Sequence, residues 1–188
     1  MKRPPPRDTL RHLLLLIRSD ARVNGPKPWR SRGFGTLVRY RVRHARRFGG
    51  WTCGLFLLPI DLLLSLRRPS DAEIPSSARI GPGLHLPHPQ GVIVAQGCRI
   101  GPHAAIFQQV TLGGWETGIP RVKARAVIYA GAKVFGNVTI GRRAFVGANA
   151  VVTADVPPWH AAMGVPARNA RRSDGKAARD TAFLPSDS

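Results

Sequence analysis

The chain has 188 residues, with 29 Lys/Arg against 10 Asp/Glu and a formal net charge of +19. This length accommodates one domain with an appendage and excludes a large multidomain architecture. The basic excess favours anionic partners, but no signature of a nucleic-acid-binding fold accompanies it, so nucleic acid is not the expected partner. Two cysteines in separate regions give no disulfide framework, which favours a reduced, cytoplasmic protein.

The first part of the chain predicts a basic α-helical region over residues 8–70, behind a disordered, proline-rich arm over residues 1–7. Two of its helices are predicted over Thr9–Ser19, with Asp8 as N-cap, and over Phe34–Arg47. Such short helices are marginal in isolation, so we expect them to fold back onto the rest of the chain.

A third helix is predicted over Trp51–Leu66, the most apolar stretch of this region. It carries Pro59 and Asp61 and is short for a transmembrane span, so we interpret it as a buried helix. Basic residues flank it on both sides. A peripheral contact with a membrane surface therefore stays open as an alternative.

From Ile74 to Pro157 an aliphatic residue returns every six positions, and a second small or aliphatic residue follows most of these four positions later. A period of six fits neither an amphipathic helix nor an alternating strand, so the six-residue unit is itself the structural element. Three units make one triangular coil of about 18 residues. We therefore predict a mainly β fold, a parallel β-helix over residues 71–168, followed by a polar tail over residues 169–188.

Two irregularities interrupt this repeat. The first is a slip at residues 88–93, which adds two residues to one coil. The second is an excursion loop over residues 113–121, after which the repeat resumes at Val122. Loops that interrupt a repeat often carry its function, so both are candidate parts of a functional site.

The slip contains His88, which makes this histidine the candidate general base of an active site. Glu73 lies one coil earlier, where its carboxylate could hold the imidazole; a structural histidine and a surface glutamate are the alternatives. No metal site is predicted. His85 and His103 are 18 residues apart, but the slip puts them at different positions of their units, so they face different ways.

Seven stretches, together with an upstream segment around Gly33-Phe34, Tyr40-Arg41 and His44, form a specific set. They are Glu73-Ile74-Pro75, Ile80-Gly81-Pro82-Gly83, His88-Pro89-Gln90-Gly91-Val92-Ile93-Val94, Gln109-Val110-Thr111-Leu112-Gly113-Gly114, Gly131-Ala132-Lys133-Val134, Gly147-Ala148-Asn149-Ala150-Val151-Val152 and Gly164-Val165-Pro166-Ala167-Arg168. Over about residues 18–172 the chain thus resembles bacterial serine acetyltransferases, hexapeptide-repeat O-acetyltransferases with a left-handed parallel β-helix.

The resemblance implies acetyl-CoA as co-substrate, with no metal, and direct transfer of the acetyl group. It makes His88 the catalytic base, which takes the proton of an acceptor hydroxyl and returns a proton to the CoA sulfur. Glu73 matches the acidic partner of this histidine, which is normally aspartate in the family. Asp20 is a looser match to an acidic contact with the acceptor.

The resemblance also implies a set of CoA contacts. Backbone amides near Gly114 are candidates for holding the oxyanion and the pantetheine arm. Ala130 and Ala148 match small residues that line the CoA groove. Arg168, with its neighbours Arg171 and Arg172, is a candidate contact for the CoA phosphates, the alternative being a solvated tail.

Departures from the family concern the acceptor. Pro87 stands where the family has an aspartate before the histidine, and Gly118-Ile119 stands where it has an Arg-His pair. The expected activity is acetylation of L-serine or a related small hydroxyl acceptor. A sugar or polysaccharide O-acetyltransferase and a non-catalytic β-helix scaffold are the alternatives.

The resemblance also bears on assembly. Most of the long helical domain through which family trimers pair is missing, so we expect a homotrimer, with sites between subunits, and no hexamer. The chain ends in Ser188 where the family has the isoleucine that docks cysteine synthase, so a complex with that enzyme is not expected.

Overall fold

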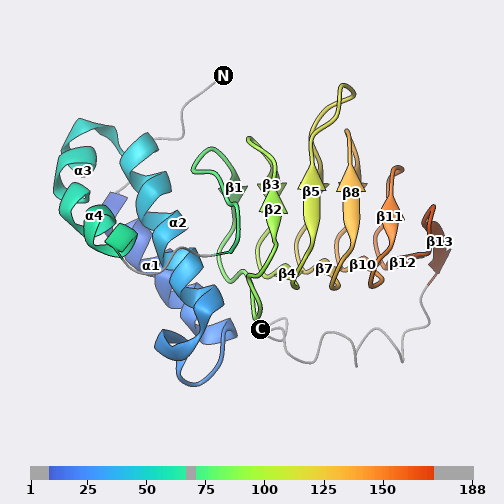
Figure 1. Ribbon diagram of the computed structural model, residues 1–188, viewed down its shortest axis with the longest axis horizontal. Helices are drawn as coiled ribbons and strands as arrows, with labels where there is room; N and C mark the ends of the chain where they lie inside the picture. Colours follow the sequence, from blue (N-terminus) through green and yellow to red (C-terminus); the bar gives the residue numbers. More distant parts are fainter. Residues whose placement is uncertain (1–8, 67–70, 172–188) are drawn as a thin grey trace.

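The computed structural model describes residues 9–66 and 71–171 of the chain, as a helical region at one end of a long solenoid (Figure 1). The helical region comes first in sequence and packs against the first coils. Its elements are α1 (Thr9–Val23), the 3-10 helix η1 (Pro28–Arg30), α2 (Arg32–Phe48), α3 (Gly50–Phe56) and α4 (Leu58–Leu66).

The solenoid consists of short strands stacked into three sheets, and its strands pair in parallel from coil to coil. The sheet orders are β1-β3-β6-β9, β11-β8-β5-β2 and β13-β12-β10-β7-β4. The strands are β1 (Arg79–Ile80), β2 (Ile93–Val94), β3 (Arg99–Ile100), β4 (Ala105–Ile106), β5 (Thr111–Gly113), β6 (Arg121–Val122), β7 (Val127–Ile128), β8 (Lys133–Phe135), β9 (Thr139–Ile140), β10 (Phe145–Val146), β11 (Val151–Val152), β12 (His160–Met163) and β13 (Arg168–Arg171). The predicted mainly β fold, a parallel β-helix, is confirmed.

The core of the solenoid is one continuous aliphatic column. The six-residue series is buried along almost its whole length, and the small residues at the second position of each unit are buried beside it, among them Ala78, Cys98, Ala104, Val110, Ala126, Ala132, Val138, Ala144 and Ala150. These residues alternate with exposed neighbours in the short strands, as in Arg79–Ile80 and Arg99–Ile100. The sequence period therefore identified the inward face.

Strand register locates both irregularities. A regular coil pairs residues 18 apart, as Ile93 with Thr111. Across the slip the pairs lie 20 apart, as Arg79 with Arg99, and across the excursion they lie 22 apart, as Thr111 with Lys133. The extra residues thus leave the coil without disturbing the pairing on either side. At the far end β13 pairs antiparallel with β12, which ends the parallel stack.

The helices differ from their predictions in two ways. Helix α1 continues to Val23, four residues beyond the predicted end, whereas the proposed cap Asp8 lies outside the described residues. The third helix is divided at Leu57 into α3 and α4. Pro59 explains the division, because it has no N–H to bond the carbonyl of Leu55 and it fits the first turn of a new helix.

The prediction that this third helix is buried is wrong. Most apolar side chains of α3 and α4 are exposed, and Asp61 is the buried residue of α4. The pattern misled because Asp61 has arginine partners on α2, which the local sequence does not reveal. No helix in the described ranges is long and apolar enough to cross a membrane.

Helix α2 joins the helical region to the solenoid. The Tyr40 hydroxyl donates to the Ala78 carbonyl at 2.7 Å, and His44 Nδ1 lies 2.8 Å from the Ser76 carbonyl. Gly33 permits the closest approach: a Cβ at this position would lie 1.5 Å from the Leu86 carbonyl oxygen. The helix therefore rests directly on the coil that leads into the slip.

Candidate active site

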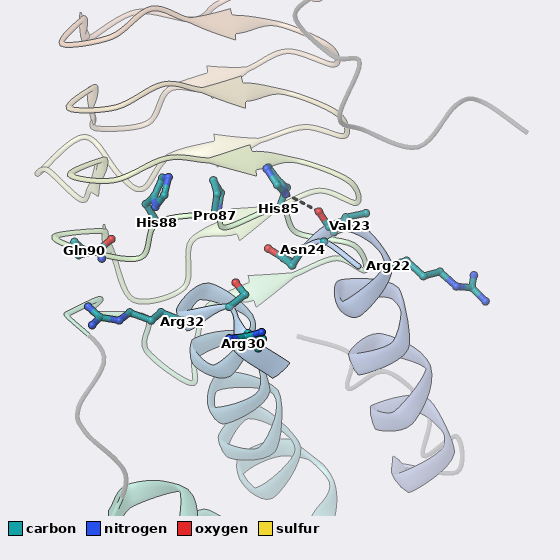
Figure 2. Close-up of a pocket in the computed structure, with 11 residues that line it drawn as sticks. Arg22, Val23, Asn24, Arg30, Arg32, His85, Pro87, His88 and Gln90 are labelled. Carbon is teal, nitrogen blue, oxygen red and sulfur yellow. Dashed lines mark hydrogen bonds between the residues drawn. The ribbon is translucent and has the colours of Figure 1, made fainter. Parts of the chain in front are cut away.

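His88 lies on the two-residue bulge of the coil and its side chain is exposed. It forms part of the wall of a cavity of about 630 Å³ between the bulge and the ends of α1 and α2. Figure 2 shows His85, Pro87 and His88 side by side along the coil. The cavity is lined by Arg22, Val23, Asn24, Gly25, Arg30, Ser31, Arg32, His85, Pro87, His88 and Gln90.

The coil segment before His88 is held by the C-terminal end of α1. The Asn24 side chain accepts from the Leu86 N–H at 3.0 Å and donates to the Leu84 carbonyl at 2.8 Å, so it bonds this segment as a neighbouring strand would. His85 Nδ1 lies 2.7 Å from the Val23 carbonyl (Figure 2). Since a carbonyl oxygen only accepts, Nδ1 carries the proton. These bonds hold the bulge in place.

His85 is a neutral ring beside His88. Burial lowers its pKa below the ordinary value, and the nearby His88 lowers it further, against the opposing effect of the Val23 hydrogen bond. The sequence pattern suggested His85 only as a possible metal ligand and missed its place in this cavity. It also missed Asn24, Arg30 and Arg32, because their position depends on how the helices dock on the coil. No spacing signal marks them.

Asp20 does not line the cavity. Its carboxylate is 1% exposed and pairs with Arg41, whose Nε lies 2.9 Å from Oδ2. Its Oδ1 accepts from the backbone N–H groups of Gly83 at 2.9 Å and Leu84 at 3.1 Å. These partners within the chain tie α1 and α2 to the solenoid backbone at Gly83 and Leu84.

Glu73 lies one coil before the bulge, where it forms a parallel bridge with Ile93, and its side chain is exposed. No hydrogen bond joins its carboxylate to the His88 imidazole in the described part of the chain. The two predicted catalytic side chains are therefore both open to solvent on adjoining coils. They do not form a preformed dyad within this chain.

The predicted CoA-lining alanines share a corner of the solenoid with the bulge. Gln109 N–H donates to the Gln90 carbonyl, Gly131 N–H to Gln108, and Asn149 N–H to Ala130, at 2.8 to 2.9 Å. Gln90, Gln108, Ala130 and Ala148 thus stack on successive coils. With rungs about 4.8 Å apart, the column extends roughly 14 Å from the bulge. Its last two members carry only a methyl group each.

The other two predicted CoA contacts lie elsewhere. Gly114 directly follows β5, next to the excursion, and a Cβ there would meet no atom closer than the Gly118 carbonyl oxygen at 3.8 Å. Arg168 is exposed on β13 at the far end of the solenoid. Among the described residues no group of three or more His, Cys, Asp or Glu could hold a metal ion.

A bulged coil with an exposed histidine, at the head of a corner that ends in two alanines, defines a hexapeptide-repeat β-helix with a candidate active site. No protein-family model matches the sequence. The chain is 37% identical over 149 residues to the serine acetyltransferase of Escherichia coli (strain K12), over 76% of this chain and 52% of that protein. It therefore spans about half the length of this curated relative.

Solved structures agree with the sequence comparison. Neisseria gonorrhoeae serine acetyltransferase aligns with a TM-score of 0.73 and 27% identity, over 92% of this chain and 72% of that one. A serine acetyltransferase in complex with cysteine aligns with a TM-score of 0.69 and 30% identity, over 91% of this chain and 69% of that one. The chain belongs to the serine acetyltransferase family.

Proposed function

We propose that this chain is an acetyl-CoA-dependent O-acetyltransferase that acetylates L-serine or a related small hydroxyl acceptor, with His88 as catalytic base. The observation that carries the proposal is an exposed imidazole on the wall of a cavity, at the start of a corner that leads to Ala130 and Ala148. Family membership supports it, since solved serine acetyltransferases include complexes with CoA and with serine.

In the proposed reaction the acceptor hydroxyl loses its proton to the His88 imidazole as its oxygen attacks the thioester carbonyl. The carbon–sulfur bond then breaks, and the same imidazole returns the proton to the CoA sulfur. The products are the O-acetylated acceptor and CoA. No covalent intermediate on the protein is required.

The remaining residues take supporting roles in this proposal. Glu73 orients the imidazole once substrates occupy the site, because catalytic hydrogen bonds often tighten only in the complex. Ala130 and Ala148 leave room for the pantetheine arm along the corner. Amides near Gly114 hold the developing oxyanion, and Arg168 meets a CoA phosphate. Gly114 and Arg168 lie away from the His88 cavity, which fits a homotrimer whose sites lie between neighbouring subunits.

A thiol-release assay with acetyl-CoA tests the proposal, with L-serine, homoserine and a panel of sugars as acceptors. We expect turnover with a small hydroxyl acceptor and a loss of about 10²- to 10⁴-fold in kcat for His88→Ala. His12→Ala, which removes an exposed histidine on α1, is the matched control and should keep full activity. Equal activity of the two variants would exclude His88 as the base.

One observation favours a second candidate, a sugar or polysaccharide O-acetyltransferase. The cavity lining contains no carboxylate, since Pro87 precedes His88 and Asp20 is bonded elsewhere. Among the described residues that line the cavity, the ammonium group of L-serine would therefore find no acidic partner, whereas a sugar needs none.

Substituting Pro87 separates the two candidates. Pro87→Asp restores a carboxylate next to the base, and a charge-assisted hydrogen bond of about 1.5–3 kcal/mol should lower KM for L-serine by roughly 10- to 100-fold. Turnover of sugars by the unmodified protein, with none of serine, would select the second candidate. Absence of both CoA binding and turnover would leave the non-catalytic scaffold.

A further inference from the structure

Helix α4 buries its charged residue and exposes most of its apolar side chains, the reverse of the usual amphipathic arrangement. Its buried side chain is Asp61, which pairs with Arg43 at 3.1 Å and with Arg46, both from α2. Its outward side chains are aliphatic and between 46% and 78% exposed: Leu58, Ile60, Leu62, Leu63 and Leu66. The ion pairs and Leu64, which packs against the cluster of Leu13, Val42, Ala45 and Leu57, hold the inner side of α4 against the protein, so the five exposed side chains are directed away from it.

Helix α3 extends this surface with Trp51, 83% exposed, Leu55, 63% exposed, and Phe56, 71% exposed. We call these eight residues of α3 and α4 the α3–α4 apolar face. Figure 1 shows both helices at the end of the molecule opposite β12 and β13. Contiguous exposed apolar surfaces of this kind mark interaction sites.

The surroundings of this face are basic. Residues 9–66 contain eleven Lys/Arg and two Asp, and both aspartates are paired with arginines. Asp61 meets two arginines of α2, so α2 and α4 together keep a net positive charge beside the leucines. Arg47, at the end of α2, stacks on Phe48, which is itself 56% exposed. In the sequence Arg67 and Arg68 follow α4 directly.

Charge decides between the two kinds of surface that could cover the apolar face. A second copy of this chain would bring one strongly basic helical region against another, and like charges across an interface oppose association. An anionic lipid surface accepts the leucines among its acyl chains and the arginines among its headgroups. At nine residues, α4 is too short to span a bilayer and suits a position in the plane of the interface.

We propose that the α3–α4 apolar face docks this protein on anionic lipid bilayers. The helices lie in the interface with Trp51 and the leucines inserted and with the arginines at the headgroups. The solenoid then extends away from the membrane, because the face is at the opposite end of the molecule from β12 (Figure 1). This inference does not depend on the proposed enzymatic activity.

Co-sedimentation of the full chain with lipid vesicles tests the inference. The probes are phosphatidylcholine vesicles with and without about 30% phosphatidylglycerol. We expect binding to the anionic vesicles at least about tenfold stronger than to the neutral ones, and weaker binding as salt shortens the Debye length. No binding of the unmodified chain to anionic vesicles would overturn the proposal.

Two pairs of variants separate the apolar and the charged contributions. Leu62→Ser, Leu63→Ser and Leu66→Ser combined should weaken binding by at least about 100-fold. Its control, Met163→Ser with Val165→Ser, removes exposed apolar groups at the other end and should bind normally. Arg47→Gln should cost about fivefold, whereas Arg99→Gln, on the solenoid, should cost little.

The triple variant must stay folded for this test, and two results with it would overturn the proposal of lipid docking. Since all three leucines are exposed, the triple variant should keep the circular dichroism spectrum and thermal midpoint of the unmodified chain. If it then sediments with anionic vesicles as well as the unmodified chain does, the face is not the docking surface. If analytical ultracentrifugation instead shows an oligomer that only the triple variant loses, the occupant is a second copy and the proposal is overturned.

Discussion

Replacing Asp20 by alanine distinguishes a structural carboxylate from one that binds the acceptor. In the structure the carboxylate accepts four hydrogen bonds: from Arg41 Nε at 2.9 Å, Arg41 Nη2 at 3.1 Å, Gly83 N–H at 2.9 Å and Leu84 N–H at 3.1 Å. Arg41 also donates to the carbonyls of Ile80 and Gly81. Asp20→Ala would leave the guanidinium buried without its counter-charge.

The size of the effect follows from this burial. Arg41 is 2% exposed and Asp20 is 1% exposed, so water screens the pair very little. Breaking a buried ion pair from one side costs about 3–5 kcal/mol, because the remaining charge is uncompensated. For a chain of this size that corresponds to a fall in Tm of roughly 6 to 20 °C. Asp71→Ala, at an exposed aspartate, is the control and should change Tm little.

Urea and thermal unfolding, followed by circular dichroism, measure the loss. The double variant Asp20→Ala with Arg41→Met should recover much of it, since removing both charges avoids the unpaired guanidinium. An unchanged Tm for Asp20→Ala, together with a large rise in KM for the acceptor, would refute the structural role. It would support the acceptor contact that the family resemblance implies.

Three further changes test other parts of the structure. Ala148→Trp should raise KM for acetyl-CoA at least about tenfold by blocking the corner, with no change in Tm because the residue is exposed. Gly33→Ala should cost about 1–3 kcal/mol in urea unfolding, because its Cβ would overlap the Leu86 carbonyl, whereas Gly35→Ala, with open space around it, should stabilise α2 by about 0.5–1 kcal/mol. The lowered pKa of His85 predicts that stability depends on pH. As the pH falls, the ring in the unfolded chain, with its ordinary pKa near 6.5, binds a proton before the ring in the folded chain does. The contribution of His85 to stability is therefore complete above about pH 6.5 and is lost as the pH falls through the lower pKa of the folded state. Below about pH 6.5 the Tm of a His85→Asn variant should fall less steeply with pH than that of the unmodified chain.

The sequence was informative wherever structure depends on local repetition. A six-residue period identified the buried column of the solenoid, including Cys98 and the alanines beside it, because each unit repeats the same environment. Breaks in that period located the bulge at His88 and the excursion after Leu112, since strand register must absorb any added residue. The alignment of Ala130 and Ala148 on one corner follows from the same count.

The helical region shows where local pattern fails. A run of leucines around Asp61 suggested a buried helix. In the structure most of these leucines are exposed instead, because Arg43 and Arg46 of α2 bind the one carboxylate of the helix and hold that side inward. The family resemblance matches Asp20 to an acceptor contact, but in the structure Asp20 is bonded to Arg41 and to the backbone N–H of Gly83. Both outcomes depend on partners that lie 15 or more residues away in the chain.

By itself, then, the sequence determined the β-helix, its inward face and the coil that carries the candidate base. These are properties of a repeat in which each residue's neighbours stand at constant offsets. Only the tertiary structure decided which side of α4 meets water, where Asp20 is bound, and that Asn24, His85, Arg30 and Arg32 surround one cavity. Those arrangements arise from the docking of helices on the coil, and no periodicity relates residues across that contact.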